Sequence, residues 1–273
     1  MTQSNGTSRG TLALDLGRAA AGALIFGLPM LMTMELWELG LYLDRWRILV
    51  LLALSFPMLM FLSHHVGFER TWSWRDDLRD TLIAYGIGIV VSGLVLIVLG
   101  VIDAETSFSE TTSMIVLQAV PAALGALLAR SQLGENAEQG KEEPGYFAEL
   151  GVMIIGALFL CLNVAPTEEM VLIAYRMTPW QSLALLLASL VIMHGFVYAS
   201  GFRGGTSRPS GAPWWDPVLR FTLVGYVLAM VIALYALWTF ERLDGHGVGQ
   251  VLSAAIVLGF PASLGAAAAR LIL

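Results

Sequence analysis

Hydrophobic residues fill runs of about 20 positions along the whole chain, and short polar stretches separate the runs. A helix of about 20 apolar residues, rising 1.5 Å per residue, is long enough to cross the hydrocarbon core of a bilayer. The pattern therefore predicts an all-α membrane protein with eight transmembrane helices. We expect them at residues 18–41, 47–66, 79–101, 112–131, 147–174, 180–200, 217–240 and 249–271.

The second half of the chain repeats the first half. Residues Gly22-Ala23-Leu24, Thr33, Glu35 and Trp46 return 134 positions later as Gly156-Ala157-Leu158, Thr167, Glu169 and Trp180. Later matches, such as Tyr85 with Tyr226 and Pro121 with Pro261, have offsets of 141 and 140. Each half is thus predicted to be a four-helix repeat. Because four crossings return the chain to its starting side, the repeats should be parallel, with a pseudo-two-fold along the membrane normal.

These patterns divide the chain into four parts. Residues 1–17 form a polar N-terminus, 18–131 the first repeat, 132–146 a linker and 147–273 the second repeat. The linker contains the sequence GENAEQGKEEPG, which is acidic and lacks apolar periodicity. We interpret it as a flexible cytoplasmic connection between the repeats.

The overall composition excludes several classes of protein. The chain is 57% hydrophobic and only 13% charged, with a mean hydropathy of +0.73, whereas soluble domains carry about 25% charged residues. The lipid bilayer is therefore the expected partner, and a homo-oligomer is compatible with the sequence. No basic surface that would bind nucleic acid is evident. Metalloprotease, hydrolase and P-loop motifs are absent from the sequence, so we expect neither an enzyme nor an organic cofactor.

The positive charges orient the predicted helices. If the N-terminus is cytoplasmic, 11 of the 15 Lys and Arg residues fall in cytoplasmic segments. The other four are Arg45, Arg47, Arg176 and Arg242. Because positive residues concentrate on the cytoplasmic side, both termini should be cytoplasmic. The expected location is a bacterial inner membrane.

Acidic residues inside two hydrophobic segments are the candidate functional groups. Glu35 and Glu38 are three residues apart in the first segment, and Glu168 and Glu169 are adjacent in the fifth. A charge at the centre of a membrane helix costs about 2.5–3.5 kcal/mol on insertion scales, and such residues are usually functional. Pro166 lacks an N–H and disfavours the helical conformation of Ala165. We therefore expect the fifth helix to break beside Glu168 and Glu169.

Carboxylates together with freed carbonyl oxygens are ligands that hard cations such as Ca²⁺ prefer. Glu35 and Glu169 are predicted at similar depths, nearer the outer face, where they would converge and bind the ion or a proton. Glu38 and Glu168 would attract cations at the outer mouth. Two close carboxylates repel and can share a proton, which would make binding sensitive to pH. The auxiliary pathway residues are Thr33, Asn163, Thr167 and His194.

The favoured function is therefore cation transport, by a channel or a proton-linked exchanger. A structural alternative is that Glu35 and Glu169 hydrogen-bond to neighbouring helices and hold the two halves together. A second class is an intramembrane enzyme acting on a lipid-like substrate, with the acids as general acid, base or metal ligands. A third class is an assembly or sensor protein of the membrane.

Three motifs give the chain a resemblance to known membrane proteins. They are MTMELWELG around Glu35, NVAPTEEM around Glu169, and a pair of helices with P-A-x-L-G-A motifs, which begin at Pro121 and Pro261 in the middle of the predicted spans. With these motifs the whole chain resembles a bacterial family of multi-pass integral membrane proteins without an assigned function, which implies a topology but no activity. The NVAPTEE run is also similar to the acidic, proline-containing helix breaks of calcium/cation antiporters. Those antiporters have inverted repeats, whereas the repeats of this chain are predicted to be parallel.

Overall fold

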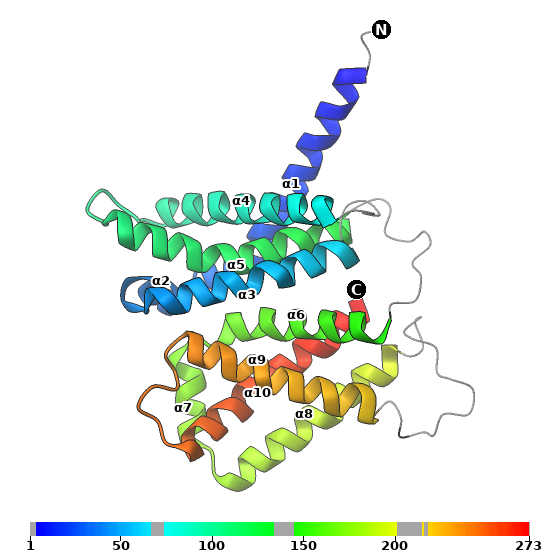
Figure 1. Ribbon diagram of the computed structural model, residues 1–273. Helices are drawn as coiled ribbons and strands as arrows, with labels where there is room; N and C mark the ends of the chain where they lie inside the picture. The colour runs from blue at the N-terminus through cyan, green and yellow to red at the C-terminus, as the bar shows by residue number, and fades with distance from the viewer. Residues whose placement is uncertain (1–3, 67–73, 134–144, 201–214, 216–217, 273) are drawn as a thin grey trace. The chain divides into compact units, whose positions relative to one another are not determined.

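The structure is a computed structural model that describes residues 4–66, 74–133, 145–200, 215 and 218–272 (Figure 1). Most of the predicted linker 132–146 lies outside the described residues. The chain divides into two compact units, Met1–Gln139 and Gly140–Leu273. Each unit is described by itself.

The first unit contains five helices in chain order. A long helix is followed by a short one and then by three further long helices. They are α1 (Ser4–Leu31), α2 (Met34–Tyr42), α3 (Arg45–Val66), α4 (Trp74–Val98) and α5 (Phe108–Leu133). Helix α1 begins within the segment expected to be a polar N-terminus, since it is helical from Ser4.

The second unit has the same order of long and short helices. They are α6 (Tyr146–Val164), α7 (Glu168–Arg176), α8 (Pro179–Ser200), α9 (Val224–Thr239) and α10 (Val248–Ile272). A π-helical segment, η1 (Val218–Leu223), leads directly into α9. The order of elements thus follows the sequence repeat, although η1 has no π-helical counterpart in α4.

Eight of the described helical segments are long and apolar enough to cross a membrane, which confirms the predicted number. They are Leu14–Leu31, Arg45–His64, Trp74–Val98, Phe108–Leu128, Tyr146–Val164, Pro179–Phe196, Val218–Thr239 and Val248–Arg270.

The first and fifth predicted spans need correction. The helix expected over 18–41 ends at Leu31, and the helix expected over 147–174 ends at Val164. The candidate acids therefore lie in the short helices α2 and α7, beyond the candidate spans, rather than in the middle of a continuous helix.

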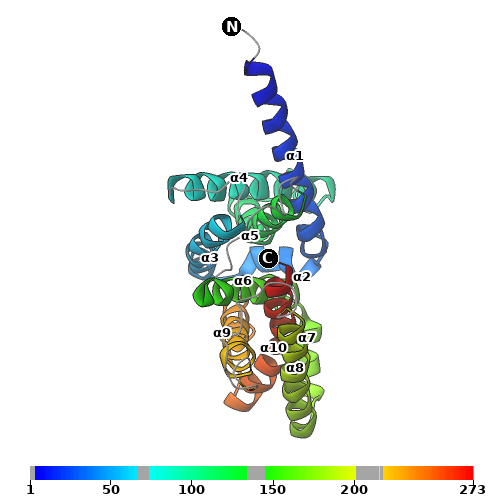
Figure 2. The same ribbon diagram turned by 90° about the vertical axis from the view of Figure 1, so that its right-hand side faces the viewer.

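The last helix of each unit packs against the other four main helices of that unit. Helix α5 contacts α1, α2, α3 and α4, and α10 contacts α6, α7, α8 and α9. Figure 2 shows α5 lying among α1, α3 and α4. Among the candidate spans of the described chain, those of α5 and α10 have the largest buried shares, 72% and 61%. They form the core of their respective units.

Glycines bring the first and last helix of each unit into backbone contact. A Cβ on Gly125 of α5 would lie 2.7 Å from the carbonyl oxygen of Gly22 in α1. In the second unit, a Cβ on Gly265 of α10 would overlap the carbonyl oxygen of Gly156 in α6. The two pairs occupy matching repeat positions, so both units use the same close approach of small residues.

A buried ion pair also joins the first and last helices of the second unit. Arg270 of α10 donates from Nε to Glu149 of α6, and the two side chains are only 7% and 3% exposed. The Arg270 guanidinium also lies 3.7 Å from the centre of the Phe221 ring. Tyr146 donates its hydroxyl hydrogen to the Arg220 carbonyl at 3.0 Å. These contacts tie α6, η1 and α10 together at one end of the unit.

We predict that Gly265→Ala destabilises the protein, because the new Cβ has no room against Gly156. Overpacking of this kind costs about 1–3 kcal/mol, and the expected result is a lower unfolding temperature in detergent. Gly249→Ala in the same helix is the matched control, since its Cβ would meet nothing within 4 Å. Equal unfolding temperatures for the two variants would contradict the backbone contact.

We further predict that Arg270→Met is strongly destabilising, since it removes the guanidinium that pairs with the buried Glu149 carboxylate. Breaking a buried ion pair at one partner costs about 3–5 kcal/mol. The double variant Glu149→Leu/Arg270→Met should recover much of this loss, because it removes both charges. Thermal unfolding in detergent distinguishes the variants. A double variant no more stable than Arg270→Met would show that the pairing of charge is not the cause.

Candidate functional site

The break between α6 and α7 positions the acids of the second unit. Pro166 has no N–H for the carbonyl four residues earlier, and α6 ends at Val164. The expectation that Ala165 leaves the helical conformation is wrong, since its φ is −58° and its ψ is −34°. The chain turns extended one residue after the proline, at Thr167, where φ is −74° and ψ is 144°. Glu168 and Glu169 then form the first turn of α7.

Polar side chains near this break bond to the end of α6. The Thr167 hydroxyl donates to the Val164 carbonyl at 2.8 Å, and the Asn163 amide donates to the Phe159 carbonyl at 2.8 Å. Thr167 makes no capping hydrogen bond to α7. The two predicted auxiliary residues therefore satisfy backbone carbonyls of the preceding helix.

Arg242 reaches the same break from the loop between α9 and α10. Its guanidinium donates a hydrogen bond to the Pro166 carbonyl, 76 positions away in the sequence. The Nε atom of Arg242 is buried and has no hydrogen-bond partner among the described residues. A tethered positive charge thus lies on the carbonyl that the helix break exposes.

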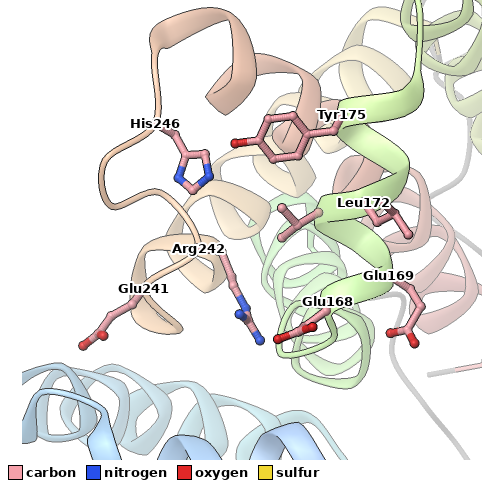
Figure 3. Close-up of a pocket in the computed structure, with 8 residues that line it drawn as sticks. Glu168, Glu169, Leu172, Tyr175, Glu241, Arg242 and His246 are labelled. Atoms are coloured by element: carbon pink, nitrogen blue, oxygen red, sulfur yellow. The ribbon is translucent and has the colours of Figure 1, made fainter.

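A pocket of about 490 Å³ opens beside this contact, between α7 and the α9–α10 loop. Its lining residues are mostly polar or aromatic: Glu168, Glu169, Val171, Leu172, Tyr175, Glu241, Arg242 and His246. Figure 3 shows the Arg242 side chain extending toward Glu168, while Glu169 points to the other side of α7. The rings of Tyr175 and His246 are 5.8 Å apart. With three carboxylates against one guanidinium, the pocket favours cations.

The first unit breaks at the matching place, although no proline stands there. Helix α1 ends at Leu31, and Thr33 is extended with φ −90° and ψ 113°. The Thr33 hydroxyl donates to the Pro29 carbonyl at 2.6 Å, and the Trp37 indole donates to the Leu31 carbonyl at 3.1 Å. Glu35 lies in the first turn of α2 and is half-buried, while Glu38 is exposed.

The loop that carries Arg242 begins with a turn that also occurs in the first unit. After α4, Gly100 has φ +70°, and the Val101 amide donates to the Leu96 carbonyl at 2.9 Å. After α9, Glu241 has φ 60°, and the Arg242 amide donates to the Leu237 carbonyl at 2.9 Å. Both are Schellman turns, in which glycine is the usual residue at the left-handed position. Glu241 therefore holds a strained conformation where the first unit has glycine.

Beyond this turn, groups of the α4–α5 loop donate hydrogen bonds to the carboxylate of Asp103, which lies in the same loop. Asp103 accepts hydrogen bonds from the Thr106 hydroxyl at 2.8 Å and from the Glu105 and Thr106 amides, both at 2.9 Å. These bonds, led by that of the Thr106 side chain, lower the pKa of the Asp103 carboxyl below its ordinary value. This carboxylate therefore stabilises its own turn.

The structure brings together only some of the predicted site residues. Glu168 and Glu169 line one pocket, whereas His194 is hydrogen-bonded at 3.0 Å to Thr222 of η1 and does not line that pocket. Glu35 belongs to the first unit and Glu169 to the second, so the prediction that they share an ion stays a prediction. Within the described part of the chain, no group of three or more His, Cys, Asp or Glu residues is arranged to hold a metal ion.

Sequence reasoning missed Glu241, Arg242, His246 and Tyr175 as neighbours of the acids. Arg242 entered it only as one of the four positive residues placed outside. The sequence repeat could have pointed to two of them. At the repeat offset of 141, Glu241 aligns with Gly100 and Arg242 aligns with Val101. Charged residues that replace glycine and valine in one copy indicate a feature specific to that copy.

The profile of a family described as "Putative integral membrane protein (DUF2391)" matches residues 15–273, which is nearly the whole chain. This match confirms the resemblance to a multi-pass membrane family. No curated protein and no solved structure matches the chain.

We predict that Glu241→Gly stabilises the protein, because glycine adopts a positive φ without steric cost. The left-handed conformation costs other residues about 1–2 kcal/mol, and a higher unfolding temperature in detergent would report the gain. Glu241→Gln is the matched control, since it removes the charge and keeps the strain. If Glu241→Gly is no more stable than Glu241→Gln, the backbone strain is not the source of the effect.

Proposed function

The chain belongs to the DUF2391 family of integral membrane proteins, and we propose that it transports cations across the bilayer in which it lies. The observation that carries this proposal is the doubled helix break. In each unit the first long helix stops, and a short helix begins with a carboxylate in its first turn. Discontinuous helices at repeated positions are the usual ion and substrate sites of transporters.

The chemistry of the two breaks fits a cation. Each break exposes backbone carbonyls at the end of a helix and sets a carboxylate four residues after the last residue of that helix. Glu35 follows the α1 end, while Glu168 and Glu169 follow the α6 end. Carbonyl and carboxylate oxygens are the ligands of hard cations. We assign Glu35 and Glu169 to ion or proton binding, and Glu38 and Glu168 to attraction of cations.

The proposal includes an arrangement of the two units. We propose that they are parallel repeats about an axis along the membrane normal, with both termini cytoplasmic, in a bacterial inner membrane. The matching order of long and short helices in the two units supports this arrangement. In it, the breaks at Leu31 and Val164 lie at the same depth. The transported ion could then meet carboxylates from both units, as either a channel or a proton-linked exchanger requires.

A helix dipole offers a structural explanation of the same acids, since carboxylates in a first turn stabilise a helix by about 0.3–1 kcal/mol. Measurements of stability and of cation flux in variants without these acids separate the two explanations. If the acids only interact with the helix dipole, their substitution causes a small loss of stability and leaves transport unchanged. Ion binding predicts loss of transport from a protein that still folds.

We predict that Glu35→Gln/Glu169→Gln abolishes cation flux. The measurement is uptake of Ca²⁺, K⁺ and H⁺ into proteoliposomes, with protein-free liposomes as the blank. Loss of one charged hydrogen-bonding partner is worth about 1.5–3 kcal/mol, so each substitution should weaken ion binding about tenfold or more.

Glu105→Gln is the matched control for loss of charge. Glu105 is an exposed acid in the α4–α5 loop and belongs to neither of the short helices α2 and α7. Its variant should transport as the unmodified protein does. Flux that is unchanged in the double variant, or no flux above protein-free liposomes for the unmodified protein, would refute cation transport through these acids.

A further inference from the structure

The guanidinium of Arg242 lies at the α6–α7 break. It donates to the Pro166 carbonyl, an oxygen that a helix break leaves available for a ligand. Glu168 stands two residues further on and lines the same pocket. A carbonyl oxygen and a carboxylate are the oxygen ligands that a hard cation takes. In the second unit, a side chain of the protein supplies the positive charge there.

The turn at Glu241 and Arg242 directs the guanidinium to this point. The Arg242 amide is held on the Leu237 carbonyl at 2.9 Å, and the Glu241 amide on the Trp238 carbonyl at 3.2 Å. Both bonds fix the backbone from which the Arg242 side chain extends. The contact with Pro166 therefore starts from an ordered turn at the end of α9.

The first unit has the same turn and a matching break, but the turn position that Arg242 occupies in the second unit carries no charge in the first. Val101 stands at the position of Arg242, and it packs against a buried cluster that contains Leu31, the last residue of α1. Met32 matches Pro166 at the repeat offset of 134. Within the described part of the chain, no backbone amide outside the helices donates a hydrogen bond to the Met32 carbonyl. The first break thus offers a carbonyl and Glu35 without a tethered cation.

We propose that Arg242 is a tethered cation that occupies the Pro166 carbonyl on the Glu168 side of the second break, and leaves Glu169 and the corresponding position of the first unit to a mobile cation. The proposal deepens the cation transport assigned above and rests on it for the first unit. It makes the two repeats unequal in function: one break carries a permanent positive charge, and the other exchanges its charge. Arg242 is then a positioning residue for the second break rather than a ligand of the transported ion.

The first experiment tests the tether by stability, which does not depend on transport. Arg242→Met keeps an apolar chain of similar length but removes the charge, and it should lower the unfolding temperature in detergent by about 5 °C. Arg242→Lys keeps the charge, so its unfolding temperature should fall less than that of Arg242→Met. In Arg242→Ala, guanidinium chloride at low millimolar concentration should restore stability, because the pocket admits the free ion.

Sodium chloride at equal ionic strength and the unmodified protein are the controls for this rescue. The tether is overturned if Arg242→Met equals the unmodified protein, or if Arg242→Lys is no better than Arg242→Met. It is also overturned if guanidinium raises the unfolding temperatures of the unmodified protein and Arg242→Ala equally.

The second experiment transfers the charge to the first unit. Val101→Arg should place a guanidinium near the end of α1, and it should weaken stabilisation of the protein by Ca²⁺ about tenfold or more. Val101→Met controls for size. Unchanged Ca²⁺ stabilisation in Val101→Arg overturns the assignment of the first break to a mobile cation.

The two experiments also separate this inference from the proposed function. Rescue of Arg242→Ala by guanidinium, together with flux that ignores Glu35 and Glu169, would retain the tether and reject transport through those acids. Flux that depends on both acids, without any rescue, would retain transport and reject the tether.

Discussion

The backbone contact between the first and last helices is the constraint from which the rest of each unit follows. Without side chains at Gly22 and Gly125, or at Gly156 and Gly265, the two helices approach until their backbones touch. In lipid there is little hydrophobic force between helices, so close packing of this kind is a main source of their association. The last helix then becomes the common partner of the other helices in its unit. The short helix also packs against it, since a Cβ on Gly40 of α2 would lie 2.9 Å from the Cα of Met114.

Hydrogen bonds from within the same unit satisfy carbonyls at the break before each short helix. A membrane gives no water to freed carbonyls, so irregular backbone must find donors in the protein or line a cavity. The first unit uses the Thr33 hydroxyl and the Trp37 indole, and the second uses Thr167, Asn163 and Arg242. In both units a threonine bonds backward to the first helix instead of capping the short one. The break is therefore built into the fold of each unit, and the acids follow from it at a fixed place.

The sequence predicted the features that depend on local composition. Long apolar runs gave eight spans, and the repeat of glycine, threonine and glutamate gave two units of similar order. The second break could be predicted from Pro166, because proline lacks the N–H that a helix needs and this property can be read from the sequence alone. The break after Leu31 could not be predicted in this way, since it depends on hydrogen bonds from Thr33 and Trp37 that compete with the helix. The Arg242 contact was hidden for a different reason: it joins positions 76 residues apart through a loop. The direction of the Arg242 side chain depends on the turn at Glu241, which has a positive φ.

The differences between the copies say more about function than their likeness does. A repeat that served packing alone would keep glycine at the left-handed turn, because glycine is the least costly residue there. The second unit instead carries Glu241 at that turn and Arg242 after it, and both line the pocket beside Glu168 and Glu169. Strained positions that persist at a pocket are usually retained for function. The same copy has the proline break and two adjacent acids, whereas the first has Glu35 and a Met32 carbonyl to which no backbone amide outside the helices of the described chain donates. The two units thus share one frame, and the second differs from the first in the charges at this turn. The proposed asymmetric pathway, with one fixed and one exchangeable cation, rests on that difference.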